Sequence, residues 1–458
     1  MKRLLSEFAR ACGGRLEGSD GPFGDVVSDS RTLAHGQLFV ALKGPNFDGA
    51  AFVSAAHAAG AAGALVPARQ NVPLPQIVVA DTQAALEAAA RVWRDAFAGP
   101  LIGVAGSNGK TTAKEMTAAI LAQAGATLAT RGNLNNHIGV PLTLLRLTDA
   151  HRFAVIETGA NHPGEVAALV ALARPSVGMI TNAGAEHLEG FGSLEGVARA
   201  EGEMVAGLAA DATAVINADD EFAAMWRTST AARVVTFGLK GGADFAASAV
   251  RASVAADGFR TEFHLTAPQG STDIRLSLAG THNVANALAA AAAAASAGAS
   301  LAHIRAGLAA VRAVPGRLQF RPGPGGAWLI DDSYNANPSS MHAAIEVLAG
   351  LEGRRWLALG DMGELGAFAA DAHTEIGEFA RAHGVERLYA TGPLMARATE
   401  SFGAGAFWFP DVPALGAALA AALAEGGPAV RLLVKGSRSN RLERLIAALT
   451  GERAPGGH

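Results

Sequence analysis

Short apolar runs alternate with longer amphipathic stretches along most of the chain, and this alternation predicts an α/β fold with parallel sheets. Between about residues 101 and 312 the runs are almost wholly apolar, as expected for strands that are buried on both faces of a parallel sheet. We predict such strands at 101–105, 153–157, 177–181, 214–217 and 234–237.

The pattern changes twice in the second half of the chain. Residues 245–279 alternate polar and apolar positions, which predicts antiparallel hairpins, and helices that begin at Asn283 and Leu301 follow them. The segment 313–317 contains the turn residues proline and glycine and predicts a hinge. A further series of apolar runs, each followed by a helical segment, then predicts a Rossmann-like doubly wound domain. Its strands are expected at 328–331, 356–359, 387–390 and 432–434.

The N-terminal part predicts a small α/β unit, with an amphipathic helix in the first ten residues and strands at 37–42 and 76–80. The expected fold is therefore α/β, with three domains around one cleft. Residues 1–83 form a small N-terminal α/β domain, residues 84–312 a central domain with a P-loop-type parallel sheet and helices, and residues 313–458 the C-terminal Rossmann-like domain.

Composition narrows the class of protein. Half of the 458 residues are apolar, but the longest apolar run, at 287–295, is too short for a membrane span. The N-terminus lacks the apolar region of a signal peptide, and a single cysteine, Cys12, rules out an internal disulfide and a cysteine metal cluster. A net charge of −4 without a basic run argues against a nucleic-acid surface. We therefore expect a cytoplasmic protein, with a monomer as the default state.

The loop after the strand at 101–105 has the features of a phosphate-binding site. Glycines let the loop backbone wrap around phosphate oxygens, and the helix that follows directs its positive end towards them. Lys110 reaches the β- and γ-phosphates of ATP, and the Thr111 hydroxyl is placed to ligate Mg²⁺. The usual pattern has a glycine where this chain has Val104, so a glycine turn with an incidental lysine is the alternative. The loop residues are Gly106, Ser107, Asn108, Gly109, Lys110, Thr111 and Thr112.

Glu157 ends the apolar strand at 153–157. Open α/β sheets bind ligands at the carboxyl ends of their strands, and a carboxylate there suits a Mg²⁺ ion that bridges the β- and γ-phosphates. The alternative is an exposed glutamate at a strand end. The sequence thus predicts ATP and Mg²⁺ as cofactors.

Further motifs, taken with this loop, resemble those of the Mur ligase family along essentially the whole chain. They follow one another in the family's order, first in the central and then in the C-terminal domain. The motifs lie at 130–141, 157–159, 181–188, 280–286, 314–317, 331–338 and 434–438.

The resemblance implies an ATP-dependent, ADP-forming ligase that phosphorylates a carboxylate and joins it to an amine. Within the family, the motifs at 187–192, 331–338 and 360–366 favour the branch that makes a peptidoglycan precursor. The implied partners are UDP-N-acetylmuramoyl-tripeptide (UDP-MurNAc-tripeptide), which supplies the carboxylate, and D-alanyl-D-alanine, which supplies the amine. The Asp-Asn-Pro-Arg motif of the relatives that add diaminopimelate is absent.

The resemblance also implies roles for individual residues. His187 is implied as a ligand of a second Mg²⁺, Asn283 as a nucleotide contact, and Arg317 and Asp332 as residues that hold ATP from across the cleft. Without the resemblance, several such residues would equally be helix caps or surface cations. The implied substrate-binding residues are Ser30, Arg31 and Lys43 at the UDP end, Asn133 and Asn136 in the central domain, Tyr334, Asn335 and Asn337 for the dipeptide, and Lys435 and Arg438 for its carboxylate or the acyl phosphate.

One position departs from the family pattern. Family members typically carry a carbamylated lysine in a helical Ala-Lys-Ala-Lys-Gly-Glu segment, and this chain has Glu201 at that position. A carbamylated lysine is a carboxylate on a long arm, so Glu201 keeps the charge with a shorter reach. We expect Glu201 to ligate the second Mg²⁺ directly or through water, and the alternative is a degenerate, inactive site.

Three other classes of protein remain as alternatives. A ligase for a different amine, such as a folylpolyglutamate synthase, shares the phosphate loop, but the motif at 331–338 argues against it. A non-catalytic nucleotide-binding regulator predicts the loss of Lys110, Glu157 or His187, and all three are present. An ordinary P-loop hydrolase would not need two further domains.

Overall fold

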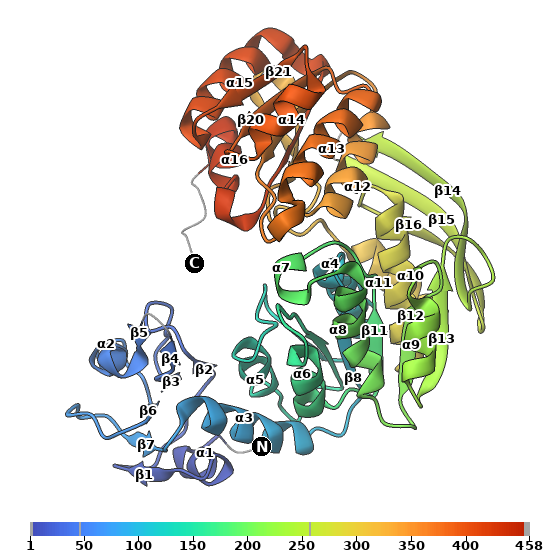
Figure 1. Cartoon of the computed structure of the whole chain (residues 1–458). Coiled ribbons are helices and arrows are strands. Elements are labelled where there is room, and N and C mark those ends of the chain that lie inside the picture. The colour runs from blue at the N-terminus through green and yellow to red at the C-terminus, as the bar shows by residue number, and fades with distance from the viewer. Residues whose placement is uncertain (1–2, 45–46, 256–257, 453–458) are drawn as a thin grey trace.

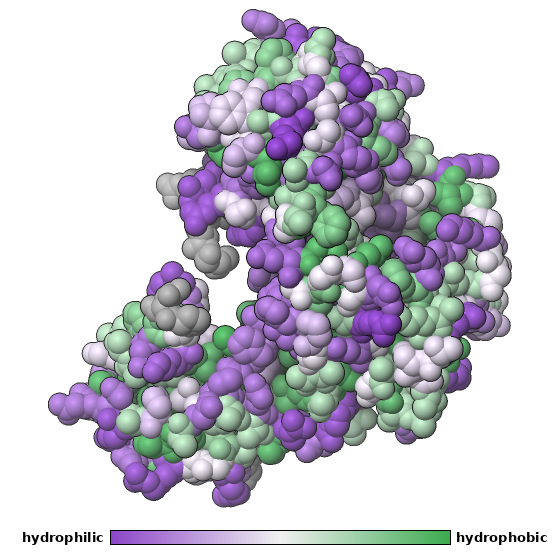
Figure 2. All heavy atoms as spheres, viewed as in Figure 1, coloured by the Kyte–Doolittle hydropathy of each residue, from purple (hydrophilic) through white to green (hydrophobic). Residues whose placement is uncertain are grey.

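The computed structural model describes residues 3–44, 47–255 and 258–452, which form three α/β domains in chain order (Figure 1). The central domain lies between the other two. Figure 2 shows an open space between the N-terminal and C-terminal domains on this face. The prediction of a three-domain α/β fold is confirmed.

The N-terminal domain is a small sheet with short helices. Its elements are α1 Leu5–Ala11, β1 Arg15–Glu17, β2 Val26–Val27, β3 Leu38–Val40, β4 Lys43–Gly44, β5 Phe47–Asp48, η1 Gly49–Phe52, α2 Val53–Ala58, β6 Gly63–Val66 and β7 Gln76–Val78. The main sheet has the order β1-β7-β6-β3-β2, in which only β1 is antiparallel to its neighbour. The predicted N-terminal helix is present, and β3 and β7 are shorter than the strands predicted there. Helix α3, Thr82–Asp95, then packs against α1 and leads into the central domain.

The central domain is built on a nine-stranded sheet. Its strands are β8 Leu101–Ala105, β9 Thr127–Ala129, β10 Phe153–Glu157, β11 Val177–Ile180, β12 Thr213–Asn217, β13 Arg233–Gly238, β14 Phe245–Ala255, β15 Gly258–Ala267 and β16 Gly270–Leu276. The order is β16-β15-β14-β13-β12-β11-β8-β10-β9, with the predicted parallel strands in the middle and the predicted hairpins at one edge. Strand β8 lies between β10 and β11, so the carboxyl ends of all three meet at one edge of the sheet.

Helices cover both faces of this sheet. They are α4 Lys110–Ala122, α5 Gly139–Leu144, α6 Glu165–Ala173, α7 Leu188–Phe191, α8 Leu194–Ala206, α9 Ala223–Ser229, α10 Thr281–Ser296 and α11 Leu301–Ala310. Successive residues of β8 point to opposite faces. Ile102 and Val104 therefore join the core formed with α4, α10 and α11, whereas Leu101 joins the core formed with α3 and α5. The run of small alanines at 287–294, interrupted only by Leu288, is wholly buried, which allows α10 to lie close to the sheet.

The C-terminal domain is a six-stranded sheet with helices on both faces, as predicted for a doubly wound domain. Its elements are β17 Gln319–Pro322, η2 Pro324–Gly326, β18 Trp328–Asp332, α12 Pro338–Ala349, β19 Arg354–Gly360, η3 Gly366–Phe368, α13 Ala369–Ala382, β20 Arg387–Thr391, α14 Met395–Phe402, β21 Ala406–Phe409, α15 Val412–Gly426, η4 Gly427–Ala429, β22 Val430–Lys435, η5 Arg438–Asn440 and α16 Glu443–Thr450. The order is β17-β18-β22-β19-β20-β21, and only β17 is antiparallel. The two edge strands, β17 and β21, were not predicted. Edge strands lack a fully buried apolar run, and Phe407 and Trp408 of β21 are exposed.

Among the described residues, one stretch of 18 residues, Val412–Ala429, meets the length and hydropathy of a membrane span, with a mean hydropathy of 1.2. Alanine supplies much of this hydropathy, and Leu415, Leu419 and Leu423 pack into the C-terminal core. Helix α15 has 15 residues, which gives about 22 Å, less than the ~30 Å of a bilayer core. We interpret α15 as a packing helix of the C-terminal domain.

The close packing of α11 on α4 gives a test of the fold. A Cβ on Gly307 would lie 2.4 Å from Ile120 Cα, whereas one on Gly416 of α15 would be 3.4 Å from Leu445 Cδ1, an ordinary contact. Gly307→Ala should cost about 1–3 kcal/mol through overpacking. Gly416→Ala should instead stabilise by up to about 1 kcal/mol, because alanine is the better helix former. The midpoints of thermal unfolding of the two variants should move in opposite directions, and equal shifts would contradict the packing described.

Candidate functional site

The loop at 106–109 connects β8 to α4, as predicted. Gly106 and Gly109 have positive φ angles of 119° and 81°. A Cβ on Gly106 would lie 2.1 Å from Thr181 Oγ1, and one on Gly109 would lie 2.3 Å from Asn286 Oδ1. Only glycine fits at either position, so the loop backbone is held tightly between the end of β11 and α10.

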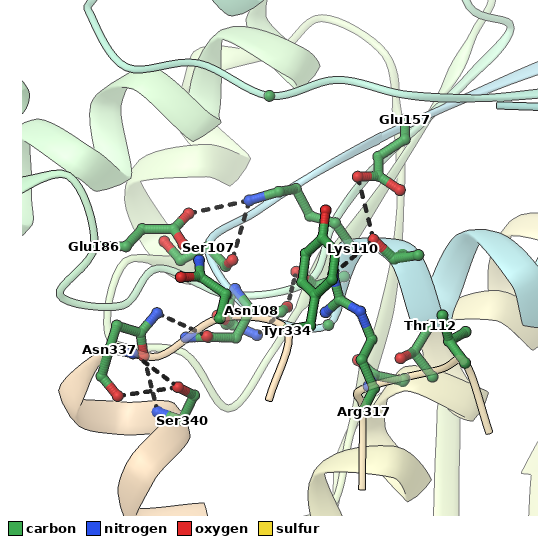
Figure 3. Close-up of a pocket in the computed structure, with 18 of the residues that line it drawn as sticks. Ser107, Asn108, Lys110, Thr112, Glu157, Glu186, Arg317, Tyr334, Asn337 and Ser340 are labelled. Atoms are coloured by element: carbon green, nitrogen blue, oxygen red, sulfur yellow. Dashed lines mark hydrogen bonds and ion pairs between the residues drawn. The ribbon is translucent and has the colours of Figure 1, made fainter. Parts of the chain in front are cut away.

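The loop opens into a cavity of about 920 Å³ between the central and C-terminal domains (Figure 3). This volume lies within the range of small-molecule and cofactor sites. The cavity brings together most of the predicted site residues, from segments far apart in the sequence. Those that line it are Ser107, Asn108, Gly109, Lys110, Thr111, Thr112, Asn133, Asn136, Glu157, His187, Asn283, Arg317, Asp332, Tyr334, Asn335, Asn337 and Lys435.

The Lys110 ammonium group is surrounded by acceptor oxygens. Its Nζ donates to Ser107 O and to Glu186 Oε1, each at 3.0 Å (Figure 3). Burial by itself would lower the pKa of Lys110, but the carboxylates of Glu186, Glu201 and Glu157 together raise it above its ordinary value. The loop is therefore flanked by a fixed positive charge at neutral pH.

Glu157 and Thr111 place oxygen ligands beside the loop. Glu157 Oε1 accepts hydrogen bonds from the Thr111 hydroxyl at 3.3 Å and from Asn135 Nδ2 at 2.9 Å. Its Oε2 is buried and has no hydrogen-bond partner among the described residues, which is costly unless a donor or a cation reaches it. These residues fit Mg²⁺, which usually takes one or two protein ligands and fills its shell with phosphates and water. Among the described residues, no group of three or more His, Cys, Asp or Glu side chains is arranged to hold a metal ion by itself.

The other two predicted metal ligands have partners within the protein. His187 Nδ1 forms an ion pair with Glu364 of the C-terminal domain. Glu201, on α8, is buried and accepts a hydrogen bond at 2.6 Å from the Gly106 N–H through its Oε2. Burial raises the pKa of the Glu201 carboxyl to about 7, although Lys110 acts in the opposite direction. Glu201 does not line the cavity, and its role in metal binding stays a prediction.

The C-terminal domain contacts the phosphate loop directly. Arg317 Nη2 donates to Thr111 Oγ1 at 3.1 Å, and the guanidinium group lies 4.5 Å from the centre of the Tyr334 ring. Asn337 Nδ2 donates to Asn108 Oδ1 at 2.9 Å (Figure 3). Arg317, which we expected to hold ATP from across the cleft, thus contacts the loop, and so does Asn337, which we expected to bind the dipeptide.

A second buried ion pair lies at the far wall of the cavity. Lys435 Nζ is 2.6 Å from Asp332 Oδ2 and also donates to the Asn335 carbonyl at 2.9 Å. Asp332 Oδ1 in turn accepts from the Leu318 N–H at 3.0 Å, which fixes the carboxylate. Burial lowers the pKa of the neighbouring His282 to about 4, so its imidazole is neutral at physiological pH.

Asn283 lies at the start of α10. The resemblance implied a nucleotide contact for it, and the alternative was a cap of the helix. Its Nδ2 donates to the Ala279 carbonyl at 2.7 Å, and its Oδ1 accepts from Asn286 Nδ2 at 3.2 Å. Both amides are buried, and both residues line the cavity. These bonds hold the start of α10 to the preceding turn, but no side chain caps the helix, so Asn283 is not the cap of the alternative interpretation, and the nucleotide contact stays a prediction.

A few predicted residues lie outside the cavity lining: Gly106, Ser30, Arg31, Lys43 and Arg438. Arg31 is exposed and paired with Asp29 at 2.7 Å, and Arg438 is paired with Glu443 at 3.3 Å. Both pairs agree with the alternative interpretation, in which these arginines are surface cations and do not bind substrate. Residues 45 and 46, which follow Lys43 closely in the sequence, lie outside the described residues.

The cavity also contains residues that the sequence did not single out, namely Asn135, Glu186, His282 and Ser339. Ser339 Oγ accepts from Asn108 Nδ2 at 2.9 Å, so it belongs to the contact between the domains. A signal for Glu186 was available, because it directly precedes His187 on a loop beyond the carboxyl end of β11. Its ion pair with Lys110 depends on the fold and has no sequence signature.

The fold and the cavity define a class of protein, namely three-domain nucleotide-dependent enzymes in which a central phosphate loop faces a Rossmann-like domain. The chain belongs to the Mur ligase family. The family profiles match residues 25–96 ("Mur ligase family, catalytic domain"), 104–294 ("Mur ligase middle domain") and 316–438 ("Mur ligase, glutamate ligase domain").

Individual relatives are similar over almost the whole chain. The UDP-N-acetylmuramoyl-tripeptide--D-alanyl-D-alanine ligase of Escherichia coli K12 is 45% identical over 445 residues, which cover 97% of this chain and 98% of that protein. A crystal structure of MurF from Acinetobacter baumannii has a TM-score of 0.89 at 34% identity and covers 99% of both chains. The structure of MurF ligase from Thermotoga maritima in complex with ADP has a TM-score of 0.78 at 26% identity, covering 93% of this chain and 97% of that one. The resemblance found in the sequence is confirmed.

The raised pKa of Glu201 predicts how stability depends on pH. A carboxyl that titrates near 7 when folded and near 4.5 when unfolded makes folding less favourable as pH rises between these values. Glu201→Gln has no ionisable carboxyl at this position, so it should not lose stability in this way as pH rises. It keeps an acceptor oxygen for the Gly106 N–H. Relative to wild type, the variant should gain at most about 3 kcal/mol in unfolding free energy between pH 5 and pH 8.

Chemical denaturation without Mg²⁺ and nucleotide measures this difference. Glu195→Gln is the control, because Glu195 lies on the same helix but is exposed. Parallel pH profiles for wild type and Glu201→Gln would contradict the assignment.

Proposed function

We propose that the chain is an ATP-dependent ligase that joins D-alanyl-D-alanine to the terminal carboxylate of UDP-MurNAc-tripeptide. The products are UDP-MurNAc-pentapeptide, ADP and phosphate, and the enzyme acts in the cytoplasm, as a monomer, in peptidoglycan precursor synthesis. The 45% identity to the E. coli enzyme, over nearly the full length of both chains, supports the substrate pair. The observation that carries the chemistry is the single cavity in which Lys110 and Glu157 face Arg317 and Asp332.

ATP binds with its phosphates on the loop, where backbone N–H groups and the start of α4 provide the donors. Lys110 compensates the charge of the β- and γ-phosphates, while Arg317 approaches from the C-terminal domain. Thr111 and Glu157 would hold Mg²⁺, and the bound ion would draw negative charge from the phosphate oxygens. The remaining residues of this part of the site are Gly106, Ser107, Asn108, Gly109, Thr112, Asn283 and Asp332 for the nucleotide and His187 and Glu201 for a second Mg²⁺.

A carboxylate does not react with an amine directly, because oxide is a poor leaving group. An oxygen of the tripeptide carboxylate attacks the γ-phosphorus of ATP, ADP leaves, and an acyl phosphate forms. The amine of D-alanyl-D-alanine then attacks the carbonyl carbon, loses a proton, and phosphate leaves. Throughout, Lys110 and Arg317 face the phosphoryl oxygens, and the docked C-terminal domain excludes water that would hydrolyse the acyl phosphate.

The two substrates reach the place where the acyl phosphate forms from different domains. The UDP end of the tripeptide substrate binds the N-terminal domain, and the dipeptide binds the loop after β18. The proposed contacts are Ser30, Arg31 and Lys43 for the UDP end, Asn133 and Asn136 for the central part, and Tyr334, Asn335, Asn337, Lys435 and Arg438 for the dipeptide and acyl phosphate. The position of Lys435 supports this, because its buried ammonium group lines the cavity and contacts Asn335 and Asp332, where an incoming anion could share it.

The release of ADP with each substrate omitted in turn tests the proposal. ADP release should require both UDP-MurNAc-tripeptide and D-alanyl-D-alanine. Lys110→Ala should lower kcat/KM about 10²- to 10³-fold, because it removes a cation that faces the developing charge. Lys240→Ala, at an exposed position of the same domain, is the control. ADP release that ignores D-alanyl-D-alanine but responds to another amine would contradict the substrate, and release without any amine would indicate a hydrolase.

The carboxylate of Glu201 predicts an enzyme that does not depend on bicarbonate. Carbamylation of a lysine consumes CO₂, and Glu201 supplies a carboxylate without it. Activity should be unchanged when CO₂ is stripped from the buffer, whereas Glu201→Lys should be weakly active and should regain activity when bicarbonate is added. A collapse of wild-type activity without CO₂ would show that another lysine is modified.

A further inference from the structure

Three side chains form a closed ring of hydrogen bonds where the C-terminal domain meets the phosphate loop. Asn108 Nδ2 donates to Ser339 Oγ at 2.9 Å, and Ser339 Oγ donates to Asn337 Oδ1 at 3.1 Å. Asn337 Nδ2 donates back to Asn108 Oδ1 at 2.9 Å (Figure 3). Within the ring, each side chain donates one hydrogen bond and accepts one. Bonds linked in this way strengthen one another, so the ring acts as a unit.

The phosphate loop presents Asn108 from a fixed backbone. Its N–H donates to Asn182 Oδ1 at 3.0 Å. Its carbonyl accepts from Thr181 Oγ1 at 2.7 Å and from Asn182 Nδ2 at 3.0 Å. Both partners follow β11 directly, so they belong to the central sheet and not to the C-terminal domain. A movement of the C-terminal domain away from the loop therefore breaks the ring, because the backbone of Asn108 does not follow it.

The C-terminal domain presents Asn337 in a similarly fixed way. Asn337 caps α12, because its Oδ1 accepts from the Ser340 N–H at 2.8 Å and its own N–H donates to Ser340 Oγ at 3.0 Å. The side chain is buried, and the cap fixes the direction of its amide. Tyr334 and Asn335, on the same loop, are proposed contacts of the dipeptide. The ring therefore joins the loop for the nucleotide phosphates to the loop for the second substrate.

Gly184 leaves the space that the ring occupies. A Cβ at this position would lie 2.7 Å from Asn108 Nδ2 and 2.9 Å from Ser339 Oγ, closer than a carbon atom approaches either. The φ angle of Gly184 lies outside the left-handed region, so the backbone conformation alone does not require glycine there. A methyl group at Gly184 would displace the ring without removing any of its members.

Ser339 closes the ring from an exposed position on the cavity wall. Its hydroxyl is neutral, as are the two amides, so the ring carries no charge that would change near neutral pH. Exposed polar contacts are of modest strength, and the ring favours the docked arrangement without locking it. Such a contact suits an enzyme whose domains must separate again when products leave.

We propose that Ser339 is a positioning residue, which through this ring couples nucleotide binding at the phosphate loop to D-alanyl-D-alanine binding at the loop 334–337. This inference rests on the proposed function, because that function assigns the two ligands to the two loops. A nucleotide bound to the phosphate loop and to Arg317 favours the docked arrangement, and the ring then holds the dipeptide loop in register. Because the coupling is thermodynamic, the dipeptide tightens nucleotide binding by the same factor.

Calorimetric titration of D-alanyl-D-alanine, with UDP-MurNAc-tripeptide present throughout, tests the proposal. In wild type, a non-hydrolysable ATP analogue should lower the Kd of the dipeptide about 5-fold or more. Ser339→Ala opens the ring, so the same analogue should lower the Kd by less than about 2-fold. Ser339→Thr keeps the hydroxyl and should restore the effect seen in wild type.

Gly184→Ala tests the ring independently, because it adds a methyl group and leaves Asn108, Ser339 and Asn337 in place. It should lose the effect of the analogue as Ser339→Ala does. Ser401→Ala is the control, because Ser401 Oγ donates to the Thr374 carbonyl at 2.7 Å within the C-terminal domain. This variant should respond to the analogue like wild type. The midpoints of thermal unfolding verify that all variants are folded.

Steady-state kinetics separate a positioning role from a role in the chemistry. At saturating ATP, Ser339→Ala should raise the KM for D-alanyl-D-alanine about 5-fold, the factor lost in the coupling, with little change in kcat. A fall in kcat at unchanged KM would overturn the proposal. So would an equal effect of the analogue in wild type, Ser339→Ala and Gly184→Ala, or no effect in wild type.

The same measurements distinguish this inference from the proposed function. If wild type ligates the two substrates but the ring variants keep the coupling, only this inference is wrong. If wild type neither binds D-alanyl-D-alanine nor ligates it, the proposed function is wrong, and this inference fails with it.

Discussion

The largely buried ammonium group of Lys110 is the charge around which the site is assembled. It lies between the Ser107 carbonyl and Glu186, with Glu201 and Glu157 close enough to raise its pKa. An unpaired buried charge would cost many kcal/mol, so a buried lysine requires partners of this kind. Its acidic partners end β10, follow β11 or lie on α8. The charge is therefore stabilised only when these elements pack around the loop together.

The contacts between the central and C-terminal domains involve the residues of the site themselves. Thr111 and Asn108 of the phosphate loop accept hydrogen bonds from Arg317 and Asn337 of the C-terminal domain. The geometry of the site therefore depends on how the two domains are docked, because the same side chains make both. Polar contacts of this kind are weaker than an apolar interface and can be exchanged for contacts to phosphates, which suits a site that must open and close.

Much of the fold could be predicted, because buried parallel strands such as β8 and β10 are marked by short apolar runs. The edge strand β21 was missed, since its exposed residues Phe407 and Trp408 follow no such pattern. In the site, residues within motifs could be predicted, and those that act through distant contacts could not. Glu186 is the clearest example, because its contact with Lys110 joins two residues that are 76 positions apart in the sequence.

The sequence by itself determined the class of fold, the position of the phosphate loop and the family, because these depend on local periodicity and on residues that are adjacent along the chain. It also showed that Glu201 replaces a lysine, but not what the carboxylate touches. Only the tertiary structure decided that Glu201 bonds the loop backbone at Gly106 and that Lys110 shares its charge with Glu186. Burial and charge pairing depend on distances between segments far apart in the sequence, and folding alone sets those distances.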